Sequence, residues 1–214
     1  MSSKVWIFCG LAMVLGGCGS NDAQMPQIVN SPADEPQSAP PEAAKPSRKK
    51  TPSNAPKDWL PPSQVEKKWT AVVIHHSATE TGNCAIFDRM HREENHWDGV
   101  GYDFVIGNGT DSSDGQVEVT FRWRKQVAGA HCGGTPDNWA KIDAVGICLV
   151  GNFNHAGATA KQMQSLSKLV RFLQERYEIA TNRVYGHSAT PGARVTDCPG
   201  RISPIAELKQ MLGS

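Results

Sequence analysis

The sequence has little of what would place it in several common classes of protein. Its charges nearly cancel, since 22 Lys and Arg oppose 21 Asp and Glu, so it lacks the broad basic field of a nucleic-acid-binding protein. A mean hydropathy of −0.42 excludes a multi-span membrane protein. Six Cys in 214 residues are too few for a scaffold built on disulfides. We therefore expect a globular body that binds no nucleic acid.

Residues 1–18 have the layout of an export signal. Lys4 precedes an apolar run from Val5 to Leu15, which is too short for a transmembrane helix of roughly 20 residues. Leu15-Gly16-Gly17-Cys18 then resembles the lipobox of bacterial lipoproteins, in which the cysteine is lipidated. We expect a lipid anchor on Cys18 and a location in the bacterial cell envelope, at the outer membrane or periplasm if the cell has two membranes. The alternative is an ordinary signal peptide with an incidental cysteine.

Residues 19–68 contain few side chains that build a core. Ten of the 14 Pro lie between Pro26 and Pro62, and no aromatic residue lies between Cys18 and Trp59. Such a segment cannot bury enough apolar area to offset its chain entropy. The composition predicts a disordered tether over residues 19–68 and a folded domain over residues 69–214.

Residues 69–214 mix the patterns of strands and helices. Runs rich in β-branched and apolar residues predict strands at 70–74, 102–106, 116–120, 144–150 and 183–186. Helices are expected from Asn83, over 160–177 where Thr159 and Gln162 form a capping box, and after Pro204. The fold class is therefore α/β or α+β around a single sheet.

Four candidate metal-binding side chains follow expected strands. His75 and His76 end the first buried strand, His187 ends the last one, and Cys198 follows eleven residues later. Imidazoles and a thiolate suit a zinc site with three protein ligands and an open position, and the short CxxC spacings of closed structural sites are absent. From spacing alone, a histidine at the end of a strand is more often a packed or capping residue than a metal ligand.

The residues around these positions make the pattern more specific. Motifs occur in a fixed order along the chain: Val73-Ile74-His75-His76-Ser77-Ala78-Thr79, Gly101-Tyr102-Asp103-Phe104, Gly129-Ala130-His131, Val145-Gly146-Ile147-Cys148-Leu149-Val150-Gly151, Gly186-His187 and Thr196-Asp197-Cys198-Pro199-Gly200. The series resembles the zinc-dependent N-acetylmuramoyl-L-alanine amidases, the family of phage amidase-type lysozymes and animal peptidoglycan recognition proteins. The resemblance covers about residues 69–212. It implies a mixed β-sheet flanked by helices, with a zinc ion in a surface groove.

The resemblance also implies roles for particular residues. The Zn²⁺ ligands, for one ion per chain, would be His75, His187 and Cys198. Tyr102 matches a tyrosine that reaches toward the zinc-bound water or the substrate carbonyl, and His131 matches a groove histidine that contacts substrate. Thr196 matches a position that is Lys in phage enzymes and Thr in many animal ones, and it is expected to take part in catalysis. The partner would be peptidoglycan or its muropeptides. The reaction would be hydrolysis of the amide between the lactyl group of N-acetylmuramic acid and L-Ala, by a water that zinc activates.

Two departures from the family pattern affect these roles. The stretch from His187 to Cys198 is some three residues longer than in phage and animal members. Thr196 is therefore matched by its distance from Cys198 and not by its distance from His187. The strand around Cys148 also has no carboxylate where cytoplasmic recycling amidases have a glutamate base, so Tyr102 becomes the leading candidate for the base.

Other histidines and tryptophans have simpler interpretations. We expect His76 either to support the metal ligands or to have a structural role, and we expect His91 and His96 to face solvent. Trp97 and Trp123 either stack on sugar rings or belong to the core.

The remaining thiols suggest a disulfide. Cys148 lies in the most apolar strand and is expected to be a small buried side chain. Cys84 follows the His75 loop and Cys132 follows His131, so both are expected at the zinc end of the sheet. We predict a Cys84–Cys132 disulfide, with two separate packed thiols as the alternative.

Two other functions fit parts of this pattern. A non-catalytic peptidoglycan-binding module would keep the groove, but such members of the family typically lose the cysteine ligand, which is present here. A zinc peptidase acting on ordinary peptide bonds would usually carry HExxH, and the sequence has none.

Overall fold

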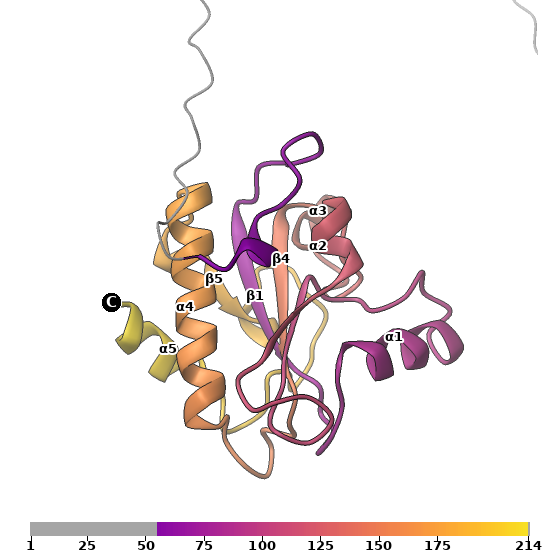
Figure 1. Cartoon of the computed structure of the whole chain (residues 1–214), viewed down its shortest axis with the longest axis vertical. Coiled ribbons are helices and arrows are strands. Elements are labelled where there is room, and N and C mark those ends of the chain that lie inside the picture. Colours follow the sequence, from indigo (N-terminus) through magenta and orange to yellow (C-terminus); the bar gives the residue numbers. More distant parts are fainter. Residues whose placement is uncertain (1–54, 214) are drawn as a thin grey trace, which may run out of the picture. The chain divides into compact units, whose positions relative to one another are not determined.

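The computed structural model describes residues 55–213, and its centre is a five-stranded sheet in the order β3-β2-β4-β1-β5 (Figure 1). The strands are β1 (Ala71–His76), β2 (Phe104–Ile106), β3 (Val117–Val119), β4 (Ala144–Leu149) and β5 (Val184–Gly186). β1 pairs in parallel with β4 and β5, β2 pairs in parallel with β4, and β3 runs antiparallel to β2. The expected single mixed sheet is confirmed.

Five α-helices and four short 3₁₀ helices complete the described part of the chain. They are η1 (Lys57–Trp59), α1 (Cys84–Glu93), α2 (Phe121–Lys125), η2 (Pro136–Asn138), α3 (Trp139–Asp143), α4 (Ala160–Tyr177), η3 (Thr181–Arg183), η4 (His187–Ala189) and α5 (Ile205–Leu212). The predicted capping box of α4 is present, since Thr159 Oγ1 accepts from Gln162 N and Gln162 Oε1 accepts from Thr159 N, both at 3.0 Å. Over residues 55–213, none of these helices combines the length and apolar character needed to span a bilayer.

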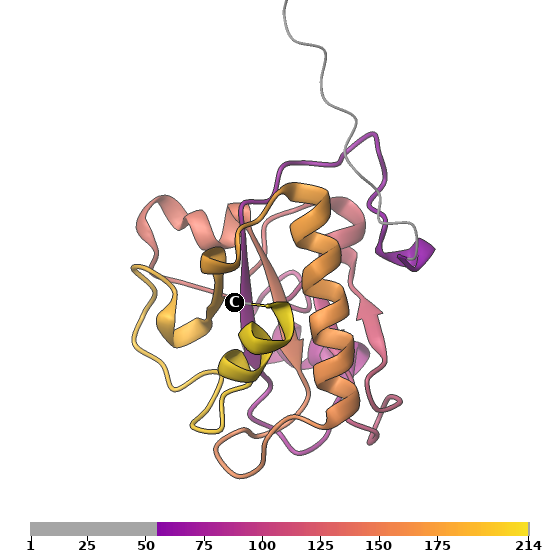
Figure 2. The ribbon, with the colours of Figure 1, turned by 90° about the vertical axis from the view of Figure 1, so that its left-hand side faces the viewer.

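The first face of the sheet, which we call the α4 face, lies against α4 and α5 (Figures 1 and 2). Side chains alternate across a strand, so Val72 and Ile74 of β1 point the same way as Val145 and Ile147 of β4. They meet a row of fully buried residues on α4: Leu166, Leu169, Val170 and Leu173. This layer is the main hydrophobic core.

The opposite face, which we call the site face, carries smaller side chains. Ala71 and Val73 of β1 and Ala144 of β4 pack against α3, while α1 packs through Phe87 near Val105. Small residues bring the covering segments close to the strands and leave room at the carboxyl end of β1. His75 belongs to this face by alternation from Ala71 and Val73.

The predicted start of the domain needs correction. Residues 1–18, Cys18 and residues 19–54 lie outside the described residues, but residues 55–68 pack on the domain instead of forming a disordered tether. Trp59 is 5% exposed and its carbonyl accepts the indole N–H of Trp123 at 2.9 Å. The Glu66 carboxylate forms an ion pair with Arg176 of α4 at 2.7 Å. Residues 55–68 are therefore held on the domain by contacts with residues far away in the sequence. Their own composition could not indicate these contacts.

Candidate metal centre

His75 and His76 point to opposite faces of the sheet at the carboxyl end of β1. His75 lies with Ala71 and Val73 on the site face. His76 lies on the α4 side, where its Nδ1 accepts the backbone N–H of Phe153 at 3.0 Å. His76 thus has the structural role expected for it, and His75 is the one available to a site.

The structure brings His75, His187 and Cys198 together. Their ligand atoms all lie within 4.8 Å of one another. His187 directly follows β5, and β5 runs parallel to β1, so the two histidines meet at the same edge of the sheet. Cys198 comes back to this edge because its carbonyl accepts the backbone N–H of Ser188 at 2.8 Å. Over residues 55–213, this is the only such group of three or more His, Cys, Asp or Glu side chains.

The spacing of these atoms fits zinc. A tetrahedral Zn²⁺ with bonds of about 2.0–2.3 Å holds its ligand atoms roughly 3.3–3.8 Å apart. Cys198 Sγ lies 3.6 Å from His75 Nδ1, and the rings of His75 and His187 have centroids 4.5 Å apart. A set of two imidazoles and one thiol is a soft donor set that zinc accepts, and it leaves a fourth position for water or substrate.

Burial sets the charge states of these three residues. Desolvation, followed by the neighbouring imidazoles of His131, His187 and His76, holds the pKa of His75 well below its usual value. Burial also lowers the pKa of His187. Both rings are therefore neutral, which is the form that binds a metal. Burial raises the pKa of the Cys198 thiol to about 12, so a nearby cation is needed to stabilise its thiolate.

His131 determines which nitrogen of His75 faces the site. His131 Nε2 lies 3.3 Å from the carbonyl of Ala144, and a carbonyl can only accept, so His131 Nε2 carries the proton. His131 Nδ1 is then the acceptor for His75 Nε2–H, 3.0 Å away. Because burial lowers the pKa of His131 to about 3, this neutral tautomer is the relevant one. The lone pair of His75 is thereby on Nδ1, the atom nearest Cys198.

Gly146 makes room for that arrangement. A Cβ at this position of β4 would lie 2.5 Å from Cδ2 of His131. His131 is only 6% exposed, so its main contacts are with His75 and Ala144, although its ring also lines the cavity described below. The predicted role of His131 as a substrate contact remains untested.

Tyr102 lies beside His75, with ring centroids 5.2 Å apart. Burial, the nearby thiols of Cys148 and Cys198, and its hydrogen bond with Cys148 raise the pKa of Tyr102 well above its usual value. The phenol therefore stays protonated at neutral pH and is suited to donating a hydrogen bond. This argues against the general-base role that the sequence suggested for Tyr102.

Sequence reasoning missed His91. It is buried, contrary to the expected exposure, and its Nδ1 accepts the backbone N–H of Gly101 at 3.0 Å. Its ring lies 5.7 Å from that of Tyr102 and 4.9 Å from that of Trp97. The signal was available in its spacing, because His91 lies four residues after the buried Phe87 on α1.

A cavity of about 410 Å³ opens beside His187. Its lining residues are Trp97, Gly129, Ala130, His131, Gly133, Lys141, His187, Arg194 and Thr196. Thr196 Oγ1 accepts the backbone N–H of Cys198 at 3.2 Å, which leaves its hydroxyl hydrogen for a ligand. Trp97 is 37% exposed at this cavity, whereas Trp123 is fully buried in the core. Of the two tryptophans, only Trp97 is placed to stack on a ligand.

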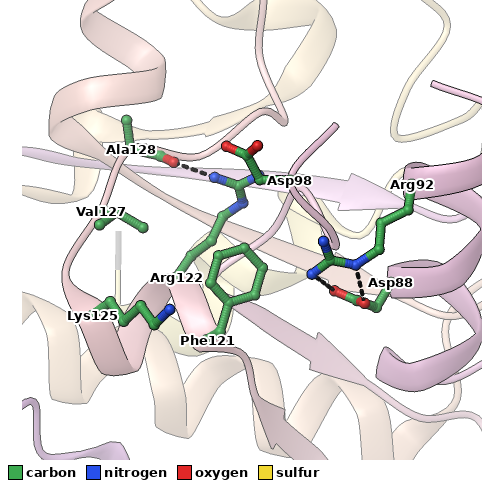
Figure 3. Close-up of a pocket in the computed structure, with 8 residues that line it drawn as sticks. All are labelled: Asp88, Arg92, Asp98, Phe121, Arg122, Lys125, Val127 and Ala128. Atoms are coloured by element: carbon green, nitrogen blue, oxygen red, sulfur yellow. Dashed lines mark hydrogen bonds and ion pairs between the residues drawn. The ribbon is translucent and has the colours of Figure 1, made fainter. Parts of the chain in front are cut away.

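A larger cavity of about 840 Å³ lies between α1 and α2 (Figure 3). It is lined by Asp88, Arg92, Asp98, Phe121, Arg122, Lys125, Val127 and Ala128. Arg92 forms an ion pair with Asp88 at 2.8 Å, and Arg122 donates to the carbonyls of Val100 and Ala128, each at 2.6 Å. The charged groups that line this larger cavity thus mostly have partners within the protein. None of His75, His187 and Cys198 lines it. The smaller cavity is therefore the one relevant to chemistry.

The predicted Cys84–Cys132 disulfide is wrong. Both residues are free thiols, as are Cys148 and Cys198. Cys84 is the first residue of α1 and packs against the cluster that contains Phe87, whereas Cys132 is fully buried near Val73 and α3. The two side chains thus belong to different clusters, as in the alternative of separate packed thiols.

Comparisons with known proteins agree with this geometry. The family model described as N-acetylmuramoyl-L-alanine amidase matches residues 65–201. The chain is 34% identical to an endolysin of Escherichia phage T7 over 137 residues, which cover 60% of this chain and 79% of the endolysin. It is 31% identical to a peptidoglycan recognition protein of Trichoplusia ni over 157 residues, covering 67% of this chain and 78% of the relative.

Solved structures show the same fold. The amidase LysC from Clostridium intestinale superposes with a TM-score of 0.57 at 29% identity, covering 68% of this chain and 86% of LysC. The bumblebee peptidoglycan recognition protein SA, at 23% identity, has a TM-score of 0.51 over 70% of this chain and 92% of its own, which supports the fold alone.

Proposed function

Because the chain belongs to the N-acetylmuramoyl-L-alanine amidase family, we propose that it is a zinc-dependent enzyme that hydrolyses the amide between the lactyl group of N-acetylmuramic acid and L-Ala of peptidoglycan. The observation that carries this proposal is the convergence of His75, His187 and Cys198 within 4.8 Å beside an open cavity. A set of three ligands with access from solvent is typical of catalytic zinc sites, whereas structural sites are closed by a fourth protein ligand.

The three clustered residues would hold the metal. Zinc bound there would supply a water of lowered pKa and would polarise the substrate carbonyl. His131 fixes the His75 tautomer that presents Nδ1 as a ligand.

Two hydroxyl groups are available to the reacting carbonyl. The Tyr102 phenol remains protonated and lies beside His75, and the Thr196 hydroxyl lines the cavity next to His187. Each can donate a hydrogen bond to the oxyanion of the tetrahedral intermediate, and one such donor contributes about 3 kcal/mol. The described part of the chain places no carboxylate among the residues that line this cavity, so proton transfer would rely on the metal-bound water and solvent.

The second candidate is a binding module without activity, as some relatives are named for recognition of peptidoglycan. The intact set of two histidines and one cysteine favours the enzyme, because recognition alone does not require a cysteine that only a cation can ionise at neutral pH.

We further propose that the protein is exported and held in the bacterial cell envelope by a lipid on Cys18. The support is the apolar run of residues 5–15 followed by Gly16-Gly17-Cys18. Replacing Cys18 with Ala should release the protein from the membrane fraction. Unchanged membrane association of that variant would contradict the anchor.

The activity is tested by incubating the purified chain with peptidoglycan sacculi and analysing the products by mass spectrometry. The proposal expects new free amino termini on L-Ala, their loss on removal of zinc with a chelator, and their return when zinc is added back. Intact amide bonds together with retention of the protein on sacculi would favour the binding module.

A further inference from the structure

The cavity beside His187 has an unbalanced charge. Lys141 and Arg194 line it, and no Asp or Glu is among its lining residues. Within residues 55–213, neither cation has a hydrogen bond or ion pair from its side chain. The larger cavity differs, because Asp88 and Asp98 lie among its cations there (Figure 3). Two cations that have no partner within the described residues and that line one concave site favour a ligand with a negative charge.

Arg194 is positioned by backbone contacts. Its N–H donates to the carbonyl of Gly133 at 3.0 Å. A Cβ on Gly134 would lie 2.6 Å from Cγ of Arg194, and a Cβ on Gly133 would lie 3.7 Å from its guanidinium carbon. The two glycines have no side chains in this space, so the Arg194 side chain extends along their backbone. Lys141 comes from α3, and its backbone carbonyl accepts the N–H of Gly129 at 2.8 Å, which places it beside the segment that leads to His131.

Arg194 lies within reach of the reacting bond, and Lys141 lines the same cavity as His187. Arg194 is four residues before Cys198, and four residues of chain span at most roughly 14 Å. In the substrate, the residue after L-Ala is a D-glutamate joined through its side-chain carboxyl, so its α-carboxylate is free. That carboxylate is two residues from the scissile carbonyl, or roughly 7 Å at the extended rise of the chain. It is the first negative charge on the peptide side of the bond.

We propose that Arg194 and Lys141 bind the free α-carboxylate of the second stem-peptide residue and so make the enzyme select an acidic residue over its amidated form. This inference rests on the proposed amidase function. Arg194 provides a planar pair of donors for a carboxylate, and Lys141 adds a point charge. Both act on substrate affinity and neither takes part in bond cleavage.

The test compares two soluble substrates that differ at one group. They are N-acetylmuramoyl-L-Ala-γ-D-Glu-L-Lys, with a free α-carboxylate, and N-acetylmuramoyl-L-Ala-D-isoglutaminyl-L-Lys, in which that group is an amide. In both, the side-chain carboxyl of the second residue is joined to L-Lys. The wild-type full chain should hydrolyse the acid with a kcat/KM about tenfold or more above that of the amide, mainly through KM. A charge-assisted hydrogen bond has this magnitude.

Variants at the two cations should remove this preference. Arg194→Ala should lower kcat/KM for the acid about tenfold and leave that for the amide unchanged, and Lys141→Ala should do the same to a smaller extent. Arg194→Lys should retain part of the preference. The matched control is Lys161→Ala, an exposed cation in the first turn of α4, which should leave both substrates unaffected.

A direct binding measurement makes the test independent of turnover. Calorimetry with the tripeptides L-Ala-γ-D-Glu-L-Lys and L-Ala-D-isoglutaminyl-L-Lys should show tighter binding of the acid to wild type and equal binding to Arg194→Ala. Equal hydrolysis of both substrates by wild type, or an equal loss on both in Arg194→Ala, would overturn this inference while leaving the amidase function standing. Cleavage of neither substrate nor of sacculi would overturn the proposed function instead, and with it this selectivity.

Discussion

The two faces of the sheet are made from the same strands and yet differ in almost every property. On the α4 face, Val72 and Ile74 meet large aliphatic side chains and form a nearly continuous apolar layer. On the site face, the alternate residues of the same strand are Ala71, Val73 and His75, and polar groups are buried among them. Stability and chemistry are thus separated by the alternation of side chains along a strand. Changes on one face should be measurable without changing the other, and the four predictions that follow test this separation.

The largest effect is expected from the metal ligands. Cys198→Ser should remove zinc binding and reduce hydrolysis of peptidoglycan by at least about a thousandfold, because a bound metal supplies several kcal/mol to the reaction. Metal content by mass spectrometry and hydrolysis of sacculi are the measurements. The α4 face should not respond, so the metal-free variant and metal-free wild type should unfold at similar urea concentrations. Full zinc occupancy in Cys198→Ser would contradict the ligand assignment.

The converse change is on the α4 face. Leu169 is fully buried in the main core, and Leu169→Ala should lower the free energy of unfolding by about 2–5 kcal/mol through lost burial and the cavity left behind. Urea denaturation measures this loss. Zinc affinity under native conditions should stay within about twofold of wild type. If zinc affinity fell in step with stability, the two faces would not be separate.

Asp103 should make the site face sensitive to pH. Its side chain is fully buried, its Oδ2 accepts from Gly146 N at 2.8 Å, and within residues 55–213 its Oδ1 has no hydrogen-bond partner. Burial raises the pKa of Asp103 to about 7, although Gly146 and the cations Lys67 and Arg122 oppose that rise. The folded protein therefore holds a proton that the unfolded chain releases above a pH of about 4.

The direction of this pH effect follows from the raised pKa. The stabilising contribution of protonated Asp103 is present at low pH and is lost as the pH rises from about 4 to about 7. Between pH 5 and pH 7, this group should lower the free energy of unfolding by about 2 kcal/mol. Asp103→Asn keeps an acceptor for Gly146 N–H and should remove that part of the pH dependence. Identical slopes for wild type and Asp103→Asn in urea titrations would refute it.

The smallest effect is expected at His131. His131→Ala removes the acceptor that fixes the tautomer of His75, so zinc affinity should fall about tenfold, at the lower end of what loss of such a partner costs. Competition with a chelator measures that affinity. The variant Gly146→Ala provides a second approach, since its Cβ would displace the His131 ring and should weaken zinc binding in the same direction. Unchanged affinity in both variants would show that the tautomer does not matter.

The sequence predicted the parts of the molecule that depend on local pattern. The bounds of α4 were predicted to the residue, because an apolar stripe and a capping box mark its length and start. Strand-end positions offered four candidate ligands, and the resemblance to the amidase family selected the three that the structure brings together. The helices α2 and α3 were missed, because five residues each are too short to show a helical period.

Long-range packing explains the other errors. Glu66 and its partner Arg176 are 110 residues apart, and no local signal links them. Cys84 and Cys132 were paired because both follow residues of the site, but each packs into its own cluster. Arg194 lies in the stretch before Cys198 that is longer than in phage and animal members, and no local pattern indicated that it lines the cavity beside His187.

The contacts of residues 55–68 also determine which element of the domain would first bear a force that pulls on the preceding chain. Trp59 is fixed against Phe172 of α4, and Glu66 is paired with Arg176 of the same helix. Tension on the chain ahead of Ala55 would therefore pass into α4 before it reached β1. The strand that carries His75 would be shielded from that force. The edge where His75, His187 and Cys198 meet would keep its geometry while the protein was pulled from its amino-terminal side.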